Sequence, residues 1–262
     1  MPAAGRLQVA GQELEYLALP GARAAPSLVL LHEGLGCVAL WKDFPALLRD
    51  ATGLPVFVYS RAGYGGSSPI TLPRPLDFHT REALEMLPAV LDAAGLTDTV
   101  LIGHSDGATI ALVYAGVTQD PRVRALVAMA PHVFCEAQTV LTIGAAKCAY
   151  QATDLRERLA RRHGANIDNA FWGWCDAWLD AGFADWSVEQ HLPGVAVPVL
   201  TVRGDDDPYS SAAHVERIAR ALPGRVERVA LAGCGHSPQL DQPTATVSAI
   251  ARFVSAVVGS VA

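Results

Sequence analysis

Six short apolar runs recur along the chain and constrain its fold more than any other feature. They occupy residues 27–32, 55–60, 99–104, 124–130, 198–204 and 225–231. Runs this short, rich in β-branched and aliphatic residues, are typical of strands that are covered on both faces, as in a parallel sheet. Helical patterns stand between several of them, at 81–96, 106–117, 214–222 and 245–258. The alternation predicts a doubly wound α/β fold with right-handed crossovers.

Two further stretches complete this outline. The opening segment alternates apolar and polar residues on either side of Ala10-Gly11, which predicts a hairpin across residues 7–19. From about residue 131 to residue 194 only helical patterns occur, and four of the five tryptophans lie there. We expect a helical cap over the edge of the sheet, formed by residues 133–193. The core would then consist of residues 1–132 and 194–262.

Composition narrows the class of protein. With 262 residues, 51% of them hydrophobic and 18% charged, the chain has too much apolar surface to be disordered. A net charge of −6 without a basic stripe argues against a nucleic-acid partner. No apolar stretch approaches the roughly 18 residues of a membrane span, and the N-terminus lacks the layout of a signal peptide. We expect a cytoplasmic protein with no membrane partner.

The cysteines do not suggest a metal site. Their number is odd, and no pair has the spacing of a zinc site or a redox motif. We expect small buried thiols without disulfides. The five are Cys37, Cys135, Cys148, Cys175 and Cys234.

The strongest chemical signal is the sequence GHSDG at residues 103–107, which directly follows a predicted strand and directly precedes a predicted helix. In this context G-x-S-x-G is typical of a nucleophile elbow. The turn is so sharp that a Cβ on either glycine would collide with neighbouring backbone. The turn raises the serine hydroxyl above the sheet, and the helix N-terminus behind it favours developing negative charge. The pattern therefore predicts Ser105 as a nucleophile.

A serine needs a base and a group that orients the base. The predicted strand at 198–204 is followed by Asp205, Asp206 and Asp207, and the next predicted strand is followed by His236. Both partners thus stand just past the carboxyl ends of successive strands. Serine, then acid, then histidine is the chain order of such a triad on this architecture.

Further motifs support a family assignment. HEGLG and SRAGYGGS follow the first two of the six strands, and GDDDP and GCGHSPQLDQP follow the last two. Together with GHSDG these motifs resemble those of the α/β-hydrolase superfamily over essentially the whole chain. The resemblance implies an eight-stranded, mostly parallel, doubly wound sheet with a helical cap inserted after the sixth strand.

The resemblance also implies roles for particular residues. Ser105 would be the nucleophile, His236 the general base and Asp207 the acid that orients it. Asp207 is chosen because it is the fourth position of the family's G-x-x-D pattern, so that Asp205 and Asp206 would be solvated or capping residues. No metal or organic cofactor is expected.

The oxyanion hole is expected to consist of backbone N–H groups. One belongs to Asp106, the residue after the nucleophile, and the other to the loop after the first of the six strands. In that loop Glu33 replaces the first glycine of the commoner His-Gly-x-x-Gly pattern. We expect Gly34 to be the donor, with Leu35 as the alternative. Glu33 itself would form a structural ion pair, with Arg61 as the candidate partner, or face the substrate.

Several side chains are candidates for contact with a substrate. The tryptophans of the predicted cap either form its core or line a pocket beneath it. Of the histidines, His132 follows a strand and could face that pocket, whereas the side chain of His104 should point away from Ser105. The charged helix at 154–163 is expected to be a solvated face, with a coenzyme A phosphate site as the alternative. The candidate substrate-binding residues are Glu33, Leu35, His104, His132, Trp172 and Trp174.

These features predict a serine hydrolase that acts on a small apolar or aromatic ester or lactone through an acyl-enzyme. The same residues would suit a hydrolase of carbon–carbon bonds in aromatic ring-cleavage products, or a thioesterase. A ligand receptor on the same fold is the alternative outside the enzymes. We expect a small-molecule substrate, and the sequence leaves open whether the protein forms a homodimer.

Overall fold

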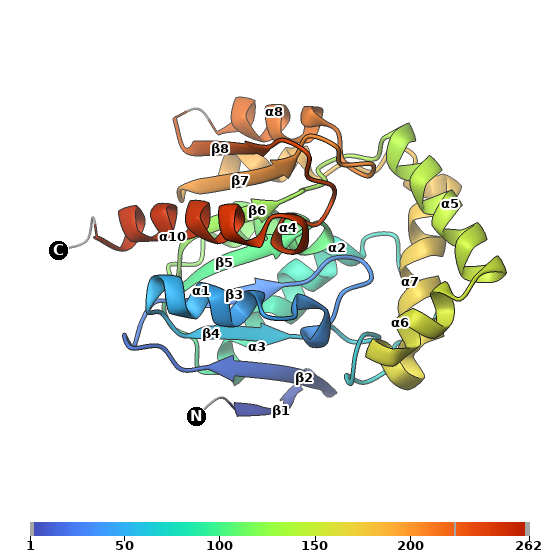
Figure 1. Cartoon of the computed structure of the whole chain (residues 1–262), viewed down its shortest axis with the longest axis horizontal. Coiled ribbons are helices and arrows are strands. Elements are labelled where there is room, and N and C mark those ends of the chain that lie inside the picture. The colour runs from blue at the N-terminus through green and yellow to red at the C-terminus, as the bar shows by residue number, and fades with distance from the viewer. Residues whose placement is uncertain (1–2, 223, 260–262) are drawn as a thin grey trace.

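Eight strands form one sheet in the computed structural model, which describes residues 3–222 and 224–259 (Figure 1). Their order across the sheet is β1-β2-β4-β3-β5-β6-β7-β8. The pairs β1–β2 and β2–β4 are antiparallel, and the remaining pairs are parallel. The strands are β1 (Ala3–Val9), β2 (Gln12–Leu19), β3 (Ser27–Leu31), β4 (Val56–Tyr59), β5 (Thr99–His104), β6 (Val123–Met129), β7 (Val199–Gly204) and β8 (Val226–Leu231).

The predicted doubly wound, mostly parallel fold is confirmed. Each of the six apolar runs is a strand whose ends lie within one residue of the prediction. The opening hairpin is present as β1 and β2, and Ala10 and Gly11 form its turn with φ angles of 48° and 79°. Positive φ at both turn residues matches the twist of the flanking strands.

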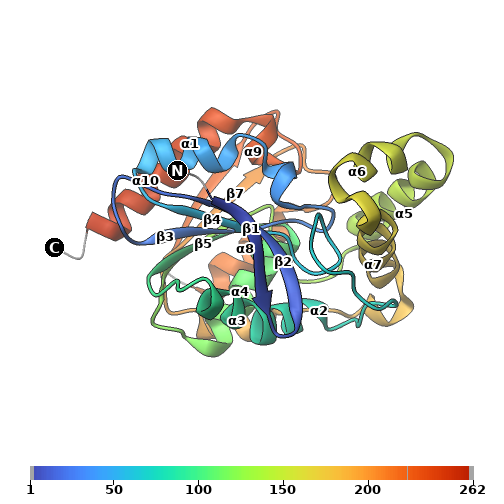
Figure 2. The same cartoon turned by 90° about the horizontal axis from the view of Figure 1, so that it is seen from below.

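Helices cover both faces of the sheet (Figures 1 and 2). Successive strand residues point to opposite faces. Leu28 and Leu30 of β3 belong to the hydrophobic cluster that includes residues of α1 and α10, and Val29 and Leu31 belong to the cluster on the other face, which includes residues of α3, α4 and α8. The helices of the core are α1 (Phe44–Thr52), α2 (Phe78–Arg81), α3 (Leu87–Ala93), α4 (Asp106–Thr118), α8 (Ala212–Ala221), α9 (Pro238–Asp241) and α10 (Pro243–Gly259), with the short turn η1 (Val38–Trp41).

The helix predicted at 81–96 is interrupted before Pro88. The segment η2 (Glu82–Met86) is a turn of π-helix between α2 and α3. Pro88 is the second residue of α3. Because a proline inside an α-helix lacks an N–H and clashes with the preceding turn, a local π turn accommodates it without ending the helical segment. Pro88 therefore stands in the first turn of α3, where a missing N–H leaves no helical hydrogen bond unmade.

A helical insertion separates β6 from β7 and lies at one end of the strands (Figure 1). Its aromatic and aliphatic side chains form a hydrophobic cluster that also includes Phe78 of α2, and within it the rings of Tyr150 and Phe171 stack with centroids 3.6 Å apart. An antiparallel bridge between Phe134 and Ser187 joins its two ends. Its elements are α5 (Ala137–Ala152), α6 (Leu155–His163), η3 (Gly164–Asn166), α7 (Ile167–Leu179), η4 (Ala181–Phe183) and η5 (Glu189–Gly194). The division of the chain at 132/133 and 193/194 stays a prediction, and its outer bounds, 1 and 262, lie outside the described residues.

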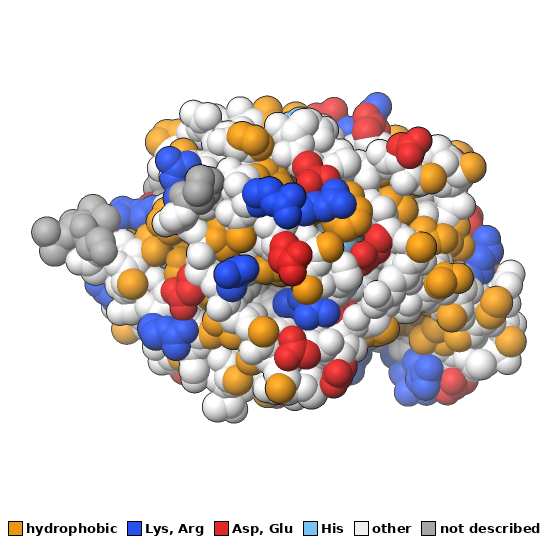
Figure 3. All heavy atoms as spheres, turned by 90° about the horizontal axis from the view of Figure 1, so that it is seen from above, with side chains coloured by type: hydrophobic (Ala, Val, Ile, Leu, Met, Phe, Trp, Pro, Cys, Tyr) orange, Lys and Arg blue, Asp and Glu red, His pale blue; other side chains and the backbone are white. Residues whose placement is uncertain are grey.

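The surface carries charges of both signs. On the face shown in Figure 3, basic and acidic side chains are interspersed with scattered hydrophobic ones. All five cysteines are free. The prediction of buried thiols is confirmed for Cys37, Cys175 and Cys234, and it is wrong for Cys148, which is exposed, and for Cys135, which is only partly buried. Within residues 3–222 and 224–259, no helix is long and apolar enough to cross a bilayer.

The glycine at position 107 provides a test of how tightly α4 packs on β3. A Cβ added there would lie 2.1 Å from the backbone oxygen of Leu31. We expect Gly107→Ala to lower the free energy of unfolding by about 3 kcal/mol, because backbone must move to admit the methyl group. Urea denaturation followed by circular dichroism measures this as a lower midpoint at an unchanged slope.

Gly144, in the middle of α5, is the matched control. A Cβ added there meets nothing within 4 Å. Gly144→Ala should raise the free energy of unfolding by about 0.5–1 kcal/mol, because alanine loses less backbone entropy in a helix. Equal effects of the two substitutions would contradict the packing described for α4.

Candidate active site

Ser105 stands at the turn between β5 and α4 with φ 52° and ψ −117°. This combination of φ and ψ is sparsely populated for a residue with a side chain, and backbone strain of this kind clusters at active sites. The turn is held by a hydrogen bond from the Ser105 N–H to the Met129 carbonyl at 2.9 Å. A Cβ on Gly103 would lie 2.3 Å from the Gly107 oxygen. The two glycines of GHSDG therefore permit the turn that exposes the serine.

A cavity of about 200 Å³ lies next to Ser105. Its walls come from loops at the ends of the strands and from α5 and α7 of the insertion. Eight of the residues singled out in the sequence line it: Glu33, Gly34, Leu35, Ser105, Asp106, His132, Trp174 and His236. The fold thus brings the predicted nucleophile, base and backbone donors to one cavity, although they are separated by up to 202 residues of chain (236 minus 34).

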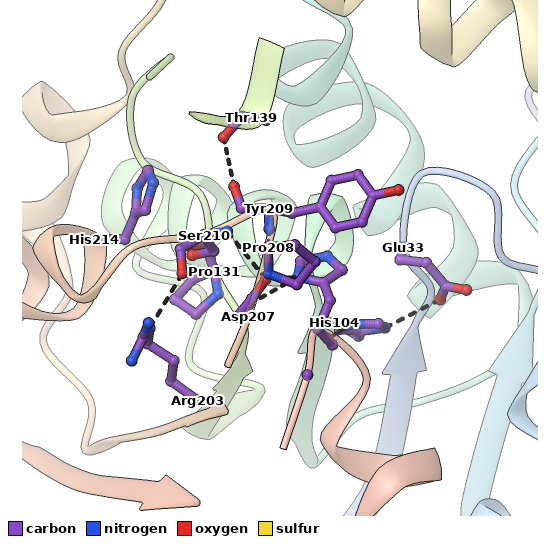
Figure 4. Close-up of polar contacts among 12 residues, drawn as sticks. Glu33, His104, Pro131, Thr139, Arg203, Asp207, Pro208, Tyr209, Ser210 and His214 are labelled. Carbon is purple, nitrogen blue, oxygen red and sulfur yellow. Dashed lines mark hydrogen bonds and ion pairs between the residues drawn. The ribbon is translucent and has the colours of Figure 1, made fainter. Parts of the chain in front are cut away.

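Asp207 lies directly against His236. The Nδ1 of His236 is 2.9 Å from both carboxylate oxygens of Asp207. The backbone N–H groups of Tyr209 and Ser210 donate to Oδ1 of Asp207 at 2.8 and 3.1 Å (Figure 4). Burial alone would raise the pKa of Asp207, but these donors hold it below its ordinary value. Asp207 is buried, whereas Asp205 and Asp206 are exposed. The carboxylate is therefore ionised and can orient the imidazole.

The hydroxyl of Ser105 and the ring of His236 line the same cavity, but no hydrogen bond joins them in the described part of the chain. Hydrogen bonds between a nucleophile and its base are often long in the absence of substrate and tighten when substrate binds. The backbone of His236 is itself fixed, because His104 Nε2 donates to its carbonyl at 2.7 Å.

Glu33 pairs with His104, not with Arg61 as expected. Its carboxylate lies 3.2 Å from His104 Nδ1 (Figure 4). Burial opposes ionisation of both groups, yet the mutual hydrogen bond and charges lower the pKa of Glu33 to about 2 and raise that of His104. The His104 ring points to Glu33 and to Gln239. It does not line the cavity, which corrects the expectation that His104 contacts a substrate.

A second buried charge pair lies behind Ser105. His79 Nε2 is 3.0 Å from Oδ1 of Asp106, and Arg61 lies 3.9 Å from Oδ2. Burial would raise the pKa of Asp106, but His79 and Arg61 lower it well below its ordinary value. The residue after the nucleophile therefore carries a fixed negative charge. Sequence reasoning missed His79, which carries no motif and comes from a separate helix.

Two tryptophans of α7 face the cavity. Trp174 packs so closely on the loop after β3 that a Cβ on Gly34 would lie 2.2 Å from its indole ring. Trp178 lines the cavity as well, and its ring lies in edge contact with His132 at 5.3 Å between centroids. The insertion therefore forms one wall of the cavity and constrains the predicted oxyanion loop.

Trp172 lies outside the cavity, contrary to its prediction as a substrate contact. Its ring packs edge-on against Tyr150 at 5.5 Å, and Lys147 Nζ lies 5.4 Å from its centroid. Phe171 belongs to the core of the insertion. Both roles weighed for these aromatic residues thus occur, because one side of α7 faces the cavity and the other packs on α5.

Five further residues line the cavity: Thr139, Ile143, Trp178, Tyr209 and Ser237. Two belong to α5, whose sequence has no motif. Ser237 directly follows the predicted base, and Tyr209 lies two residues after the predicted acid, so their positions in the chain could have indicated them. Trp178 is one of the cap tryptophans that were expected either in the core of the cap or in the wall of a pocket.

The charged helix predicted at 154–163 carries ion pairs on its surface. In the basic helix at 154–163, Arg156 pairs with Asp168 and Arg158 with Asp154. Within the two described ranges, no group of three or more His, Cys, Asp or Glu side chains could hold a metal ion. The cavity itself is lined by protein groups able to donate, accept and transfer protons.

Comparisons with known proteins agree with the fold described above. The sequence matches, over residues 26–190, the model of a family described as alpha/beta hydrolase fold. No curated protein matches the sequence. Among solved structures, a proline iminopeptidase from Mycobacterium smegmatis is similar with a TM-score of 0.72 and 21% identity, covering 97% of this chain and 98% of that chain.

Two other solved structures are similar to the same degree. An enol-lactonase from Burkholderia xenovorans LB400 has a TM-score of 0.73 and 19% identity, covering 96% of this chain and 100% of that one. A hydrolase from Pseudomonas aeruginosa PA01 has a TM-score of 0.74 and 21% identity, covering 96% and 98%. At these identities the likeness concerns the fold alone.

The pairing of His104 with Glu33 is testable by NMR titration of the ring nitrogens. In the wild type we expect His104 to titrate above 6.5, the ordinary pKa of a histidine. A raised pKa means that this group's contribution to stability is complete below pH 6.5 and is lost as the pH rises through the folded-state pKa. In Glu33→Gln the pKa should fall, because burial remains while the negative charge is gone. An unchanged titration curve would rule out the pair.

Proposed function

This chain belongs to the alpha/beta hydrolase fold family, and we propose that it is a serine hydrolase that cleaves a small apolar or aromatic carboxylic ester or lactone. One observation carries the proposal. The strained Ser105 opens into the same cavity as His236, and His236 is hydrogen-bonded to a buried, ionised Asp207. A strained serine beside an oriented imidazole is suited to nucleophilic catalysis.

In the first half of the reaction, Ser105 Oγ attacks the carbonyl carbon while His236 Nε2 takes the hydroxyl proton. Asp207 accepts the hydrogen bond from Nδ1, which keeps the imidazole in the required tautomer and stabilises the imidazolium. The tetrahedral intermediate then collapses. The bond to the leaving oxygen breaks, His236 gives its proton to that oxygen, and the acyl group stays on Ser105.

The negative oxygen of the intermediate would be stabilised by two backbone N–H groups. Asp106 is the first residue of α4, where N–H groups have no partner within the helix. Gly34 lines the cavity from the opposite loop. In the second half of the reaction, water attacks the acyl-enzyme with His236 as base, and the carboxylic acid leaves.

The walls of the cavity favour a small, largely apolar substrate. At about 200 Å³ it is smaller than the pockets that bind drug-sized ligands. Ile143, Trp174 and Trp178 provide apolar walls. We propose that Glu33, Leu35, His132 and Trp174 contact the substrate. On this proposal residues 133–193 form a cap over a core of residues 1–132 and 194–262.

The lactone part of the proposal has one external support. An enol-lactonase, named for the hydrolysis of a lactone, shares the fold over nearly the full length of this chain. Carbon–carbon bond hydrolysis and thioester hydrolysis would use the same serine, and the structure has no feature that favours either. A panel of aryl esters, thioesters and lactones separates these substrates by rate.

The nucleophile is tested by covalent labelling. A fluorophosphonate should add once to the wild type, and peptide mapping should locate the adduct on Ser105. Ser105→Ala should keep its circular dichroism spectrum, take no label and lose at least about 10⁴-fold in kcat on aryl esters, because the remaining groups cannot form an acyl-enzyme.

Ser237→Ala is the control for the labelling, since Ser237 also lines the cavity. This variant should still take the label. An adduct on Ser237, or substantial esterase turnover by Ser105→Ala, would refute the assignment of the nucleophile.

The three consecutive aspartates provide an internal control for the acid. Asp207→Asn should lower kcat by about 10⁴-fold, because an amide N–H facing Nδ1 favours the wrong tautomer of His236. Asp206→Asn should stay within about twofold of the wild type, since surface substitutions have small effects and Asp206 is exposed. Steady-state kinetics on one aryl ester measures both, and the reverse order of effects would move the acid to position 206.

A further inference from the structure

Arg61 is a buried cation that the proposed reaction does not use. It belongs to SRAGYGGS, the motif after β4, and its side chain is 1% exposed. Burying a guanidinium is costly unless its N–H groups are hydrogen-bonded and its charge is balanced. Its partners therefore indicate what the residue does.

The hydrogen bonds that the Arg61 guanidinium donates reach the loop after β3. Its Nη1 donates to the carbonyl of His32 at 3.1 Å and its Nη2 to the carbonyl of Glu33 at 3.0 Å. The backbone N–H of Arg61 donates to His32 Nε2 at 3.0 Å, so that His32 Nδ1 carries the proton and donates to the same Glu33 carbonyl at 2.7 Å. The result is a closed ring of hydrogen bonds between two loops.

We propose that Arg61 is a positioning residue for the oxyanion hole, an inference that rests on the proposed function. The peptide bond between Glu33 and Gly34 is planar and trans, so its carbonyl and its N–H point in opposite directions. Arg61 and His32 fix the Glu33 carbonyl on their side of the loop. The Gly34 N–H is thereby directed away from them, and Gly34 lines the cavity.

The same guanidinium also faces the second donor. Its Nη2 lies 3.9 Å from Oδ2 of Asp106, whose backbone N–H is the other donor of the proposed hole. A carboxylate so close to a developing oxyanion would repel it. The positive charge of Arg61 balances that carboxylate, because opposite charges interact strongly in a buried site. Arg61 thus orients one donor and neutralises the charge attached to the other.

Arg74 is a matched control for a purely structural role. It is also buried, at 6% exposed, and it packs over Tyr64, as Arg61 does: their Cζ atoms lie 5.0 and 5.1 Å from the ring centroid. Its hydrogen bond goes to the Ala62 carbonyl at 3.5 Å. In the described part of the chain, no hydrogen bond or ion pair joins Arg74 to the loop after β3. Arg74→Lys therefore removes a buried guanidinium and keeps the positive charge, as Arg61→Lys does, but it leaves the hydrogen bonds of that loop in place.

The test compares Arg61→Lys and Arg61→Met with Arg74→Lys. Lysine keeps the charge but cannot hold two carbonyls at once, because it lacks the planar fork of arginine. For Arg61→Lys we expect kcat on an aryl ester to fall about 10- to 100-fold, somewhat less than the loss of a whole oxyanion donor, since His32 still holds the carbonyl. KM should change by less than about threefold, because the donor acts in the transition state.

A transition-state analogue gives a second readout. An aryl boronic acid forms a tetrahedral adduct with a nucleophilic serine, so its affinity should fall by the same factor as kcat in both Arg61 variants, with a larger loss in Arg61→Met. Arg74→Lys should keep both kcat and boronate affinity, whatever it does to thermal stability. If Arg61→Met does not fold, Arg61→Lys still tests the positioning role, because lysine keeps the positive charge that balances Asp106 in the buried site.

The outcomes separate the two proposals. Wild-type protein that takes no fluorophosphonate label at Ser105 overturns the proposed function and this inference with it. Labelled wild type with unaltered kcat and boronate affinity in Arg61→Lys overturns the positioning role alone. Equal losses in Arg61→Lys and Arg74→Lys also overturn it, because they would reduce Arg61 to a packing residue.

Discussion

The strained turn at Ser105 is the constraint on which the rest of the site depends. It requires glycine on both sides, because at Gly103 and Gly107 neighbouring backbone lies where a Cβ would be. At Gly107 that backbone belongs to the end of β3, at Leu31. The N-terminal end of α4 therefore lies directly against the end of β3, the strand that leads into the proposed oxyanion loop. The strained turn thus brings Ser105, the first turn of α4 and the loop after β3 close together.

Two groups of paired charges lie close to this turn, one formed by Glu33 and His104 and the other by Asp106 with His79 and Arg61. Glu33 and His104 lie beneath His236, whose carbonyl accepts a hydrogen bond from His104. Asp106 lies behind the proposed oxyanion hole, between His79 and Arg61. Buried charges are tolerated when they are paired and hydrogen-bonded. Glu33 and His104 are hydrogen-bonded to each other, and Asp106 is hydrogen-bonded to His79 and balanced by the charge of Arg61 at 3.9 Å. His104 also holds the carbonyl of His236, and Arg61 holds the carbonyls of His32 and Glu33.

The helical insertion is attached to the same loops that carry the site. His163, 2% exposed, donates from Nε2 to the Leu35 carbonyl at 2.9 Å and accepts at Nδ1 from the Gly65 N–H at 3.1 Å. Asn166 donates to the carbonyls of Gly65 and Ser67. With Trp174 against Gly34, these contacts make the insertion part of the site's framework. The size of the cavity is therefore set jointly by the sheet and by how the insertion sits on it.

The sequence by itself determined the strands, the sheet and the order in which Ser105, Asp207 and His236 occur, because apolar periodicity and sharp turns depend on residues close together in the chain. The sequence also identified the motif SRAGYGGS, which contains Arg61, but it did not indicate which groups Arg61 binds. Only the tertiary structure decided that Glu33 pairs with His104, that Arg61 binds backbone carbonyls and that Trp174, not Trp172, faces the cavity. The physical reason is that a buried polar side chain takes whichever partner the packing of distant elements brings within about 3 Å. The identity of that partner is not encoded near it in the chain.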